Sequence, residues 1–195
     1  MTTLPVGYTY NDSSLESSPV SMPILGELLQ DVMWNEDDSR ALRRAGEILT
    51  PQTSEILDAW YDFIGSTPHL VSTFRGPDGK PDQAYLDKVR GRFERWIVDL
   101  CTRDFDAQWL AYQEEIGKRH TPDKKNRTDG VDSPSTYVPM SHLIALIVPV
   151  TVTVREFLER GASEDDNVDA MQQAWFKAVT LSVALWTRPY APDLW

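Results

Sequence analysis

The apolar residues of this chain recur at helical spacing almost from end to end, and this spacing constrains the fold more than any other sequence feature. The clearest case is the series Phe105, Trp109, Tyr112, Ile116 and His120, in which every step is three or four residues. Such steps place all of these side chains on one face of an α-helix. No segment alternates apolar and polar residues over a useful length, as a half-buried strand would. The sequence therefore predicts an all-α domain.

Caps and breakers divide the chain into about seven or eight helices. Residues 140–160 are apolar on nearly all sides, which indicates a central buried helix, and Pro149 is expected to kink it. Ser163 and Asp166 resemble a capping box for the last helix, and Asp104 is the expected cap of the helix that ends near His120. Residues 121–139 form a long polar loop, and long loops inside compact domains are often functional.

Length and charge narrow the class of protein. The chain has 195 residues, which fits one domain with a sizeable core, and its formal net charge is −11. This charge argues against nucleic acid and anionic membranes as partners, because both require clustered Lys and Arg. Cys101 is the single cysteine, which suits a reducing cytoplasm, and the N-terminus has no signal-peptide pattern. The uncharged run 135–154 is interpreted as a buried helix and not as a membrane span.

The three histidines are the candidates for a metal-binding site. His69 follows a helix end, and His142 starts the apolar helix 140–160. His120 differs because it continues an apolar stripe to the end of its helix. Its commonest interpretation is a hydrogen-bonded core residue, and the alternative is an axial iron ligand with the opposite coordination position left open. Zinc is disfavoured because no H-x-x-x-H or C-x-x-C pair exists, and no G-x-S-x-G, P-loop or G-x-G-x-x-G motif is present.

Several segments taken together resemble one family. They are "EILDAWYDFIGSTPHL", "YLDKVRGRFERWIVDLC", "WLAYQEEIGKRH", "KKNRTDGV" and "AWFKAVTLSVALWTRPY". They are similar to the protoglobins, single-domain haem globins of archaea and bacteria, and the similarity runs from Gly7 to "RPY" at Arg188. The resemblance implies a globin fold with an additional N-terminal helix. It also implies that residues 1–20 form an extension that folds over the haem, and that residues 21–195 form a single haem domain.

The resemblance further implies how the haem is held. In "EIGKRH", His120 matches the family's proximal ligand to the iron of a non-covalent haem b. Arg92 is the first choice for a partner of the haem propionates, which need cationic or hydroxyl partners when buried, and a surface arginine is the alternative. The implied haem-contacting residues are Val89, Arg92, Phe93, Ile116, His120 and Leu146.

The ligand-binding side is implied by residues of other helices. Trp60 and Tyr61 match the family's distal aromatic pair, and Phe93 matches a position that faces the bound gas. Apolar tunnels are expected to be lined by Trp60, Phe74 and Leu146, with Leu146 standing where a phenylalanine is usual. All of these side chains recur at helical spacing, so plain core packing is the alternative that periodicity does not reject.

The implied function is reversible binding of O2, CO and NO at a pentacoordinate haem iron. The resemblance also implies a homodimer through the last two helices, with a monomer that has a thicker core as the alternative. Two other functions are kept open. One is a helical interaction module without a cofactor, and the other is a haem enzyme acting on NO, peroxynitrite or peroxide, or capable of carbene transfer. Haem content separates the interaction module from the two haem proteins.

Overall fold

The structure, a computed structural model that describes residues 4–195, is built from helices, as the spacing predicts. Within these residues, extended backbone pairs only at an isolated bridge between Arg75 and Pro81. The all-α prediction is therefore confirmed. The α-helical segments are α1 (Met22–Asp31), α2 (Glu36–Leu49), α3 (Thr53–Gly65), α4 (Pro68–Val71), α5 (Gln83–Thr102), α6 (Ala107–Lys118), α7 (Met140–Ala145), α8 (Ile147–Gly161) and α9 (Val168–Thr187).

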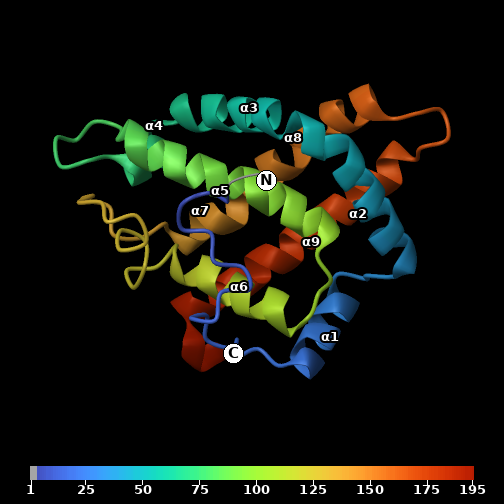
Figure 1. Cartoon of the computed structure of the whole chain (residues 1–195), viewed down its shortest axis with the longest axis horizontal. Coiled ribbons are helices and arrows are strands. Elements are labelled where there is room, and N and C mark those ends of the chain that lie inside the picture. Colours follow the sequence, from blue (N-terminus) through green and yellow to red (C-terminus); the bar gives the residue numbers. More distant parts are fainter. Residues whose placement is uncertain (1–3) are drawn as a thin grey trace.

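Helix α9 lies at the centre of the fold. Figure 1 shows α9 crossing the middle of the molecule, with α3 and α5 side by side above it and α6 below. It packs against α2, α6 and α8, and its residues Trp175 and Leu181 are fully buried. The remaining helices surround it, so that α3, α5, α6 and α7 can enclose a cavity beside its C-terminal half.

The prediction of residues 140–160 as the central buried helix is wrong. The structure leaves one face of α7 and α8 at the surface, where Ile144, Val148 and Val152 are 48%, 64% and 63% exposed. Hydropathy showed that the segment is apolar on nearly all sides, but it could not show which sides other helices cover. The expected kink is found as a break at Leu146, between α7 and α8. Pro149 explains it, because proline has no N–H to donate one turn back and its ring crowds that carbonyl.

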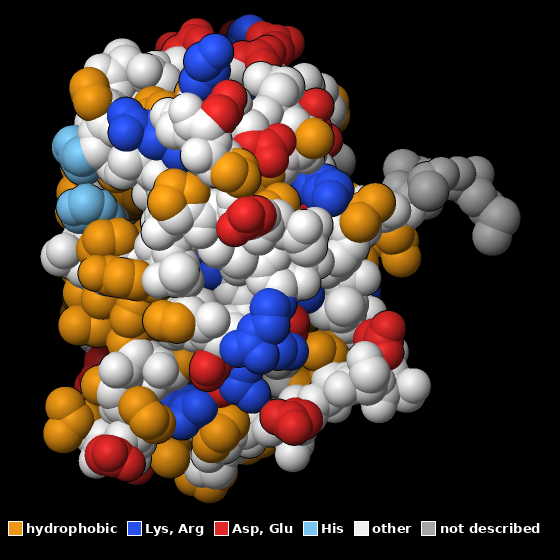
Figure 2. Space-filling model, turned by 90° about the vertical axis from the view of Figure 1, so that its left-hand side faces the viewer, with side chains coloured by type: hydrophobic (Ala, Val, Ile, Leu, Met, Phe, Trp, Pro, Cys, Tyr) orange, Lys and Arg blue, Asp and Glu red, His pale blue; other side chains and the backbone are white. Residues whose placement is uncertain are grey.

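The segment Met140–Gly161 is also long and apolar enough to cross a membrane, as judged by length and composition alone. Only 22% of its most apolar window is buried. Core helices of soluble proteins pass the same test, so it is weak evidence for a span. Figure 2 shows hydrophobic side chains gathered along one edge of the molecule, beside histidine side chains. We call the exposed apolar surface of α7, α8 and α9 the α8–α9 face. Its residues are Met140 and Ile144 of α7, Val148 and Val152 of α8, and Phe176 of α9.

Two helix starts differ from the expected ones. Asp106, and not Asp104, caps α6, because its side chain accepts from a backbone N–H of the first turn. Helix α9 is capped by Asn167. Asp166 does accept the backbone N–H of Ser163 at 2.8 Å, but this bond closes a turn ahead of the helix.

The N-terminal segment lies over α5 and α6, as Figure 1 shows. The rings of Tyr8 and Tyr10 pack edge-on against Tyr112 of α6, with centroids 5.4 Å and 5.5 Å away. Arg92 of α5 donates to the backbone carbonyl of Val6 at 2.9 Å. Because Tyr112 and Arg92 also line the main cavity, the segment covers one of the cavity walls.

Candidate functional site

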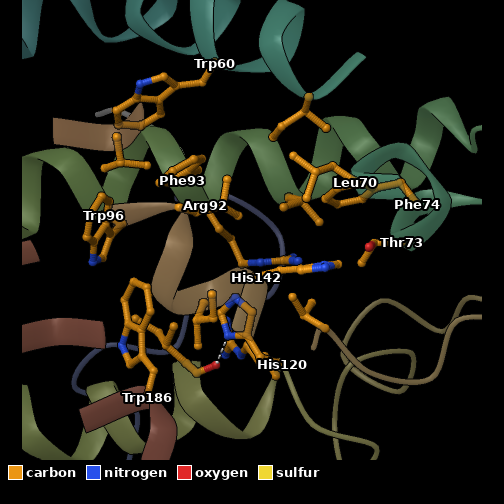
Figure 3. Close-up of a pocket in the computed structure, with 18 of the residues that line it drawn as sticks. Trp60, Leu70, Thr73, Phe74, Arg92, Phe93, Trp96, His120, His142 and Trp186 are labelled. Carbon is orange, nitrogen blue, oxygen red and sulfur yellow. Dashed lines mark hydrogen bonds between the residues drawn. The ribbon is translucent and has the colours of Figure 1, made fainter. Parts of the chain in front are cut away.

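A largely apolar cavity of about 250 Å³ lies between α3, α5, α6, α7 and the C-terminal half of α9. In Figure 3, Trp60 and Phe93 lie on one side of it, and His120 and Trp186 lie on the opposite side. The structure brings every residue predicted for the site to this cavity, although their roles remain predictions. These residues are Trp60, Tyr61, Phe74, Val89, Arg92, Phe93, Ile116, His120 and Leu146.

His120 is held in one orientation and one tautomer. Its Nδ1 lies 2.8 Å from the carbonyl oxygen of Ile116, one turn earlier in the chain. A carbonyl oxygen only accepts, so Nδ1 carries the hydrogen and Nε2 keeps its lone pair. Burial lowers the pKa of His120 to about 4, so the ring is neutral at physiological pH. A neutral imidazole with a free Nε2 is the form that binds a metal.

Contacts from the C-terminal part of the chain fix the ring further. The indole of Trp186 stacks on it with centroids 5.6 Å apart, and Trp186 Nε1 donates to Gln113 at 2.8 Å. The Tyr190 hydroxyl lies 3.1 Å from the His120 carbonyl and 2.6 Å from that of Val138. Such partners orient a ligating histidine. Sequence reasoning missed the roles of Gln113 and Tyr190, although both lie in the quoted segments, because their contacts join distant parts of the chain.

The opposite wall is aromatic. The rings of Trp60 and Phe93 stack with centroids 4.7 Å apart. Trp60 Nε1 is buried and has no hydrogen-bond partner among residues 4–195. Burial raises the pKa of Tyr61, so its hydroxyl stays protonated and can donate. Val89 is apolar, so it adds no donor here, whereas Trp60 and Tyr61 each bring a polar hydrogen to the cavity.

Arg92 occupies a polar part of the cavity wall, but its charge is already paired. Its guanidinium donates to both carboxylate oxygens of Asp129, at 2.8 Å and 2.7 Å, and the Asp129 side chain is 1% exposed. A haem propionate would therefore share this guanidinium with Asp129. No sequence pattern predicted this pairing, because Arg92 lies on α5 and Asp129 lies in the loop 121–139.

These features define a class of protein. A helical domain that aims one fixed, neutral imidazole into an aromatic cavity is built as haem globins are built. The residues fit a haem. Nε2 of His120 is free, the walls are largely apolar, and the buried indole N–H of Trp60 has no hydrogen-bond partner among residues 4–195.

The comparison with known families agrees. The family model for protoglobins matches residues 22–195, so the chain belongs to the protoglobin family. Membership implies a haem cofactor and gaseous ligands. The match begins at the start of α1 and therefore does not include the N-terminal segment. A search of curated proteins finds no match to the chain.

Proposed function

We propose that this protoglobin binds O2, CO and NO reversibly at a pentacoordinate haem b iron, with His120 as the one protein ligand. When bound, the haem supplies an iron with one open position for a gas. The observation that carries the proposal is the state of His120, whose Nδ1 is committed to Ile116 while Nε2 is free. The cavity places the apolar Val89 and Phe93 across from it, which favours a small uncharged ligand.

Absorption spectra of the purified, haem-loaded protein test this proposal. We expect one haem per chain, and a ferrous–CO spectrum of the histidine type. We also expect O2 to dissociate and rebind without net oxidation during the measurement. A chain that takes up no stoichiometric haem would instead be an interaction module. Rapid turnover of peroxide or peroxynitrite, with unstable O2 binding, would favour the haem enzyme.

We propose that the Tyr61 hydroxyl donates a hydrogen bond to bound O2. A bond to a partly charged acceptor contributes about 1–3 kcal/mol. Tyr61→Phe is therefore expected to speed O2 release by about tenfold and to change CO release little, because bound CO is less polar. Stopped-flow dissociation rates for both gases measure this. Tyr85→Phe, which removes another hydroxyl from the same cavity wall, is the matched control. Equal acceleration of both gases by Tyr61→Phe would show that the ring packs and does not donate.

Gas access is proposed to follow apolar paths past Trp60, Phe74 and Leu146. These residues line the cavity from α3, from the turn after α4, and from the break between α7 and α8. Because the helix is interrupted at Leu146, its side chain does not have to follow one continuous helical face. Two of the three residues, Phe74 and Leu146, therefore lie outside the α-helices, where a helix ends or is interrupted.

We further propose that the α8–α9 face pairs with its copy in a homodimer. Its residues Ile144, Val148 and Val152 are spaced by four, and Phe176 of the neighbouring helix is 47% exposed. A contiguous exposed apolar face of this kind marks an interaction surface. If a second copy of the chain covers this face, the face does not need a membrane to cover it. We therefore propose a cytoplasmic location. Cys101 is the single cysteine of the chain, so no intrachain disulfide forms, which suits a reducing compartment.

Val148→Asp is expected to raise the dissociation constant of the dimer at least about tenfold, because the new charge is buried without a partner. Sedimentation velocity over a range of concentrations measures this. Leu194→Asp replaces an apolar side chain at the C-terminus that is even more exposed, and it is expected to leave the dimer intact. A parent that sediments as a monomer at all concentrations contradicts the dimer, and binding of the parent to lipid vesicles would favour a membrane.

A further inference from the structure

One wall of the cavity contains a buried ammonium group that lacks an anionic partner. Lys125 lies in the loop 121–139, lines the cavity and is 3% exposed. Its Nζ donates to three neutral oxygens, namely the carbonyls of Thr73 at 2.9 Å and Ser135 at 2.8 Å, and the amide oxygen of Asn126 at 3.2 Å. Among residues 4–195, no carboxylate forms an ion pair with it.

Other cations of the same wall are paired. Arg92 is bound by Asp129, and Arg119 is bound by Glu115 at 3.1 Å. Asp129 acts on Lys125 only at longer range, because Arg92 holds its carboxylate. A buried charge is usually paired, because leaving it alone costs much of its hydration energy. The wall therefore carries a positive charge that no carboxylate of residues 4–195 neutralises by direct pairing.

The titration behaviour of Lys125 agrees with its geometry. Burial lowers the pKa of the ammonium to about 8, and the charge of Asp129 offsets only part of that shift. The ring of Tyr85, 5.2 Å from Nζ, gives an additional weak cation–π contact. These neutral contacts hold the group in place, but they do not replace an anion.

We infer that Lys125 is the main ionic partner of a haem propionate, and that it selects a cofactor with a free carboxylate at this edge of the cavity. The inference rests on the proposed haem function. It is favoured by position, since Lys125, Thr73 and Arg92 line the same cavity as His120. The contact to Asn126 is the longest of the three made by Nζ and is the one that a carboxylate most readily replaces.

The test compares protohaem with its dimethyl ester, which has the same ring and no carboxylates. The variant Lys125→Gln removes the charge but keeps N–H donors for the carbonyls of Thr73 and Ser135. Its neighbour Lys124 is the matched control, because it pairs with Glu115 at 2.6 Å and does not line the cavity. The measured quantity is the rate of transfer of each haem to an excess of an apoglobin acceptor.

For the parent and Lys124→Gln, we expect protohaem to be released at least about tenfold more slowly than the ester. In Lys125→Gln, the two rates are expected to converge, with the ester rate unchanged. Loss of both haems to the same extent would show that Lys125 only supports the loop, and would overturn the inference. So would a parent that does not distinguish the two haems. A parent that binds neither haem overturns the proposed function itself, which is a different result.

If Lys125→Gln does not fold, Lys125→Arg supplies the second test. It keeps the charge and the donors in a larger side chain, and the preference for protohaem is expected to persist. A folded Lys125→Arg protein that binds both haems equally would overturn the inference.

Discussion

Replacing His120 with alanine is expected to abolish the histidine-type ferrous–CO spectrum and to speed haem loss by at least about tenfold. The expected loss is large because His120 is the proposed ligand itself, and loss even of a group that only supports a metal ligand costs about 10- to 100-fold in affinity. Added imidazole should restore the spectrum, because the variant leaves a hole of the right shape beside Trp186. The spectra of reduced, CO-saturated protein with and without imidazole measure both effects.

His142→Ala is the matched control for this experiment. His142 also lines the cavity, and its Nδ1 is buried without a hydrogen-bond partner among residues 4–195. Unlike His120, it has no backbone acceptor that sets its tautomer. We expect the His142 variant to keep the parent spectrum. If His142→Ala removed the spectrum and His120→Ala kept it, the assignment of the proximal ligand would be wrong.

Asp38→Ala is expected to lower the free energy of unfolding by about 3–5 kcal/mol, as breaking one half of a buried ion pair usually does. Both carboxylate oxygens of Asp38 accept from Lys177 Nζ, at 2.9 Å and 2.8 Å, and both side chains are 10% exposed. Asp38 also accepts the backbone N–H of Asn35 at the start of α2. The variant thus leaves an ammonium unpaired in the interface between α2 and α9. Chemical denaturation of the haem-free protein measures the change.

The neighbouring Asp37 shows how much of this effect depends on burial. Asp37 pairs with Arg40, but both side chains are largely exposed. Exposed pairs contribute about 0–1 kcal/mol, so Asp37→Ala is expected to change stability by no more than that. Equal losses in the two variants would assign the effect to the charge of the first helical turn and not to the buried pair.

Helical spacing predicted the class of the fold and the position of His120 at the end of an apolar stripe, because both depend on local periodicity. The hydrogen bond that sets the tautomer of His120 is local as well, since its acceptor, the carbonyl of Ile116, lies one turn earlier. Resemblance to a family supplied Trp60 and Tyr61. Periodicity failed for residues 140–160, because an apolar face looks the same in sequence whether another helix covers it or not.

No sequence pattern predicts which charged side chains pair with one another around the cavity. Arg92 was predicted as a contact of the haem, but its bond to Asp129 joins α5 to the loop 121–139. Lys125 reads in sequence as part of a polar, exposed run. Its burial arises because Thr73 and Ser135 present carbonyl oxygens from two separate segments. Such arrangements depend on how distant segments meet, which spacing does not record.

Arg92 also joins the two coverings of the cavity, because the same guanidinium binds the N-terminal segment at Val6 and the loop at Asp129. Local opening of either covering therefore breaks one of these bonds and leaves the other in place, so the two coverings share one anchor on α5. Exchange of the cofactor then requires an opening event in which at least one of these bonds to Arg92 breaks. The lifetime of the loaded protein is set by that event as much as by the strength of any one contact inside the cavity.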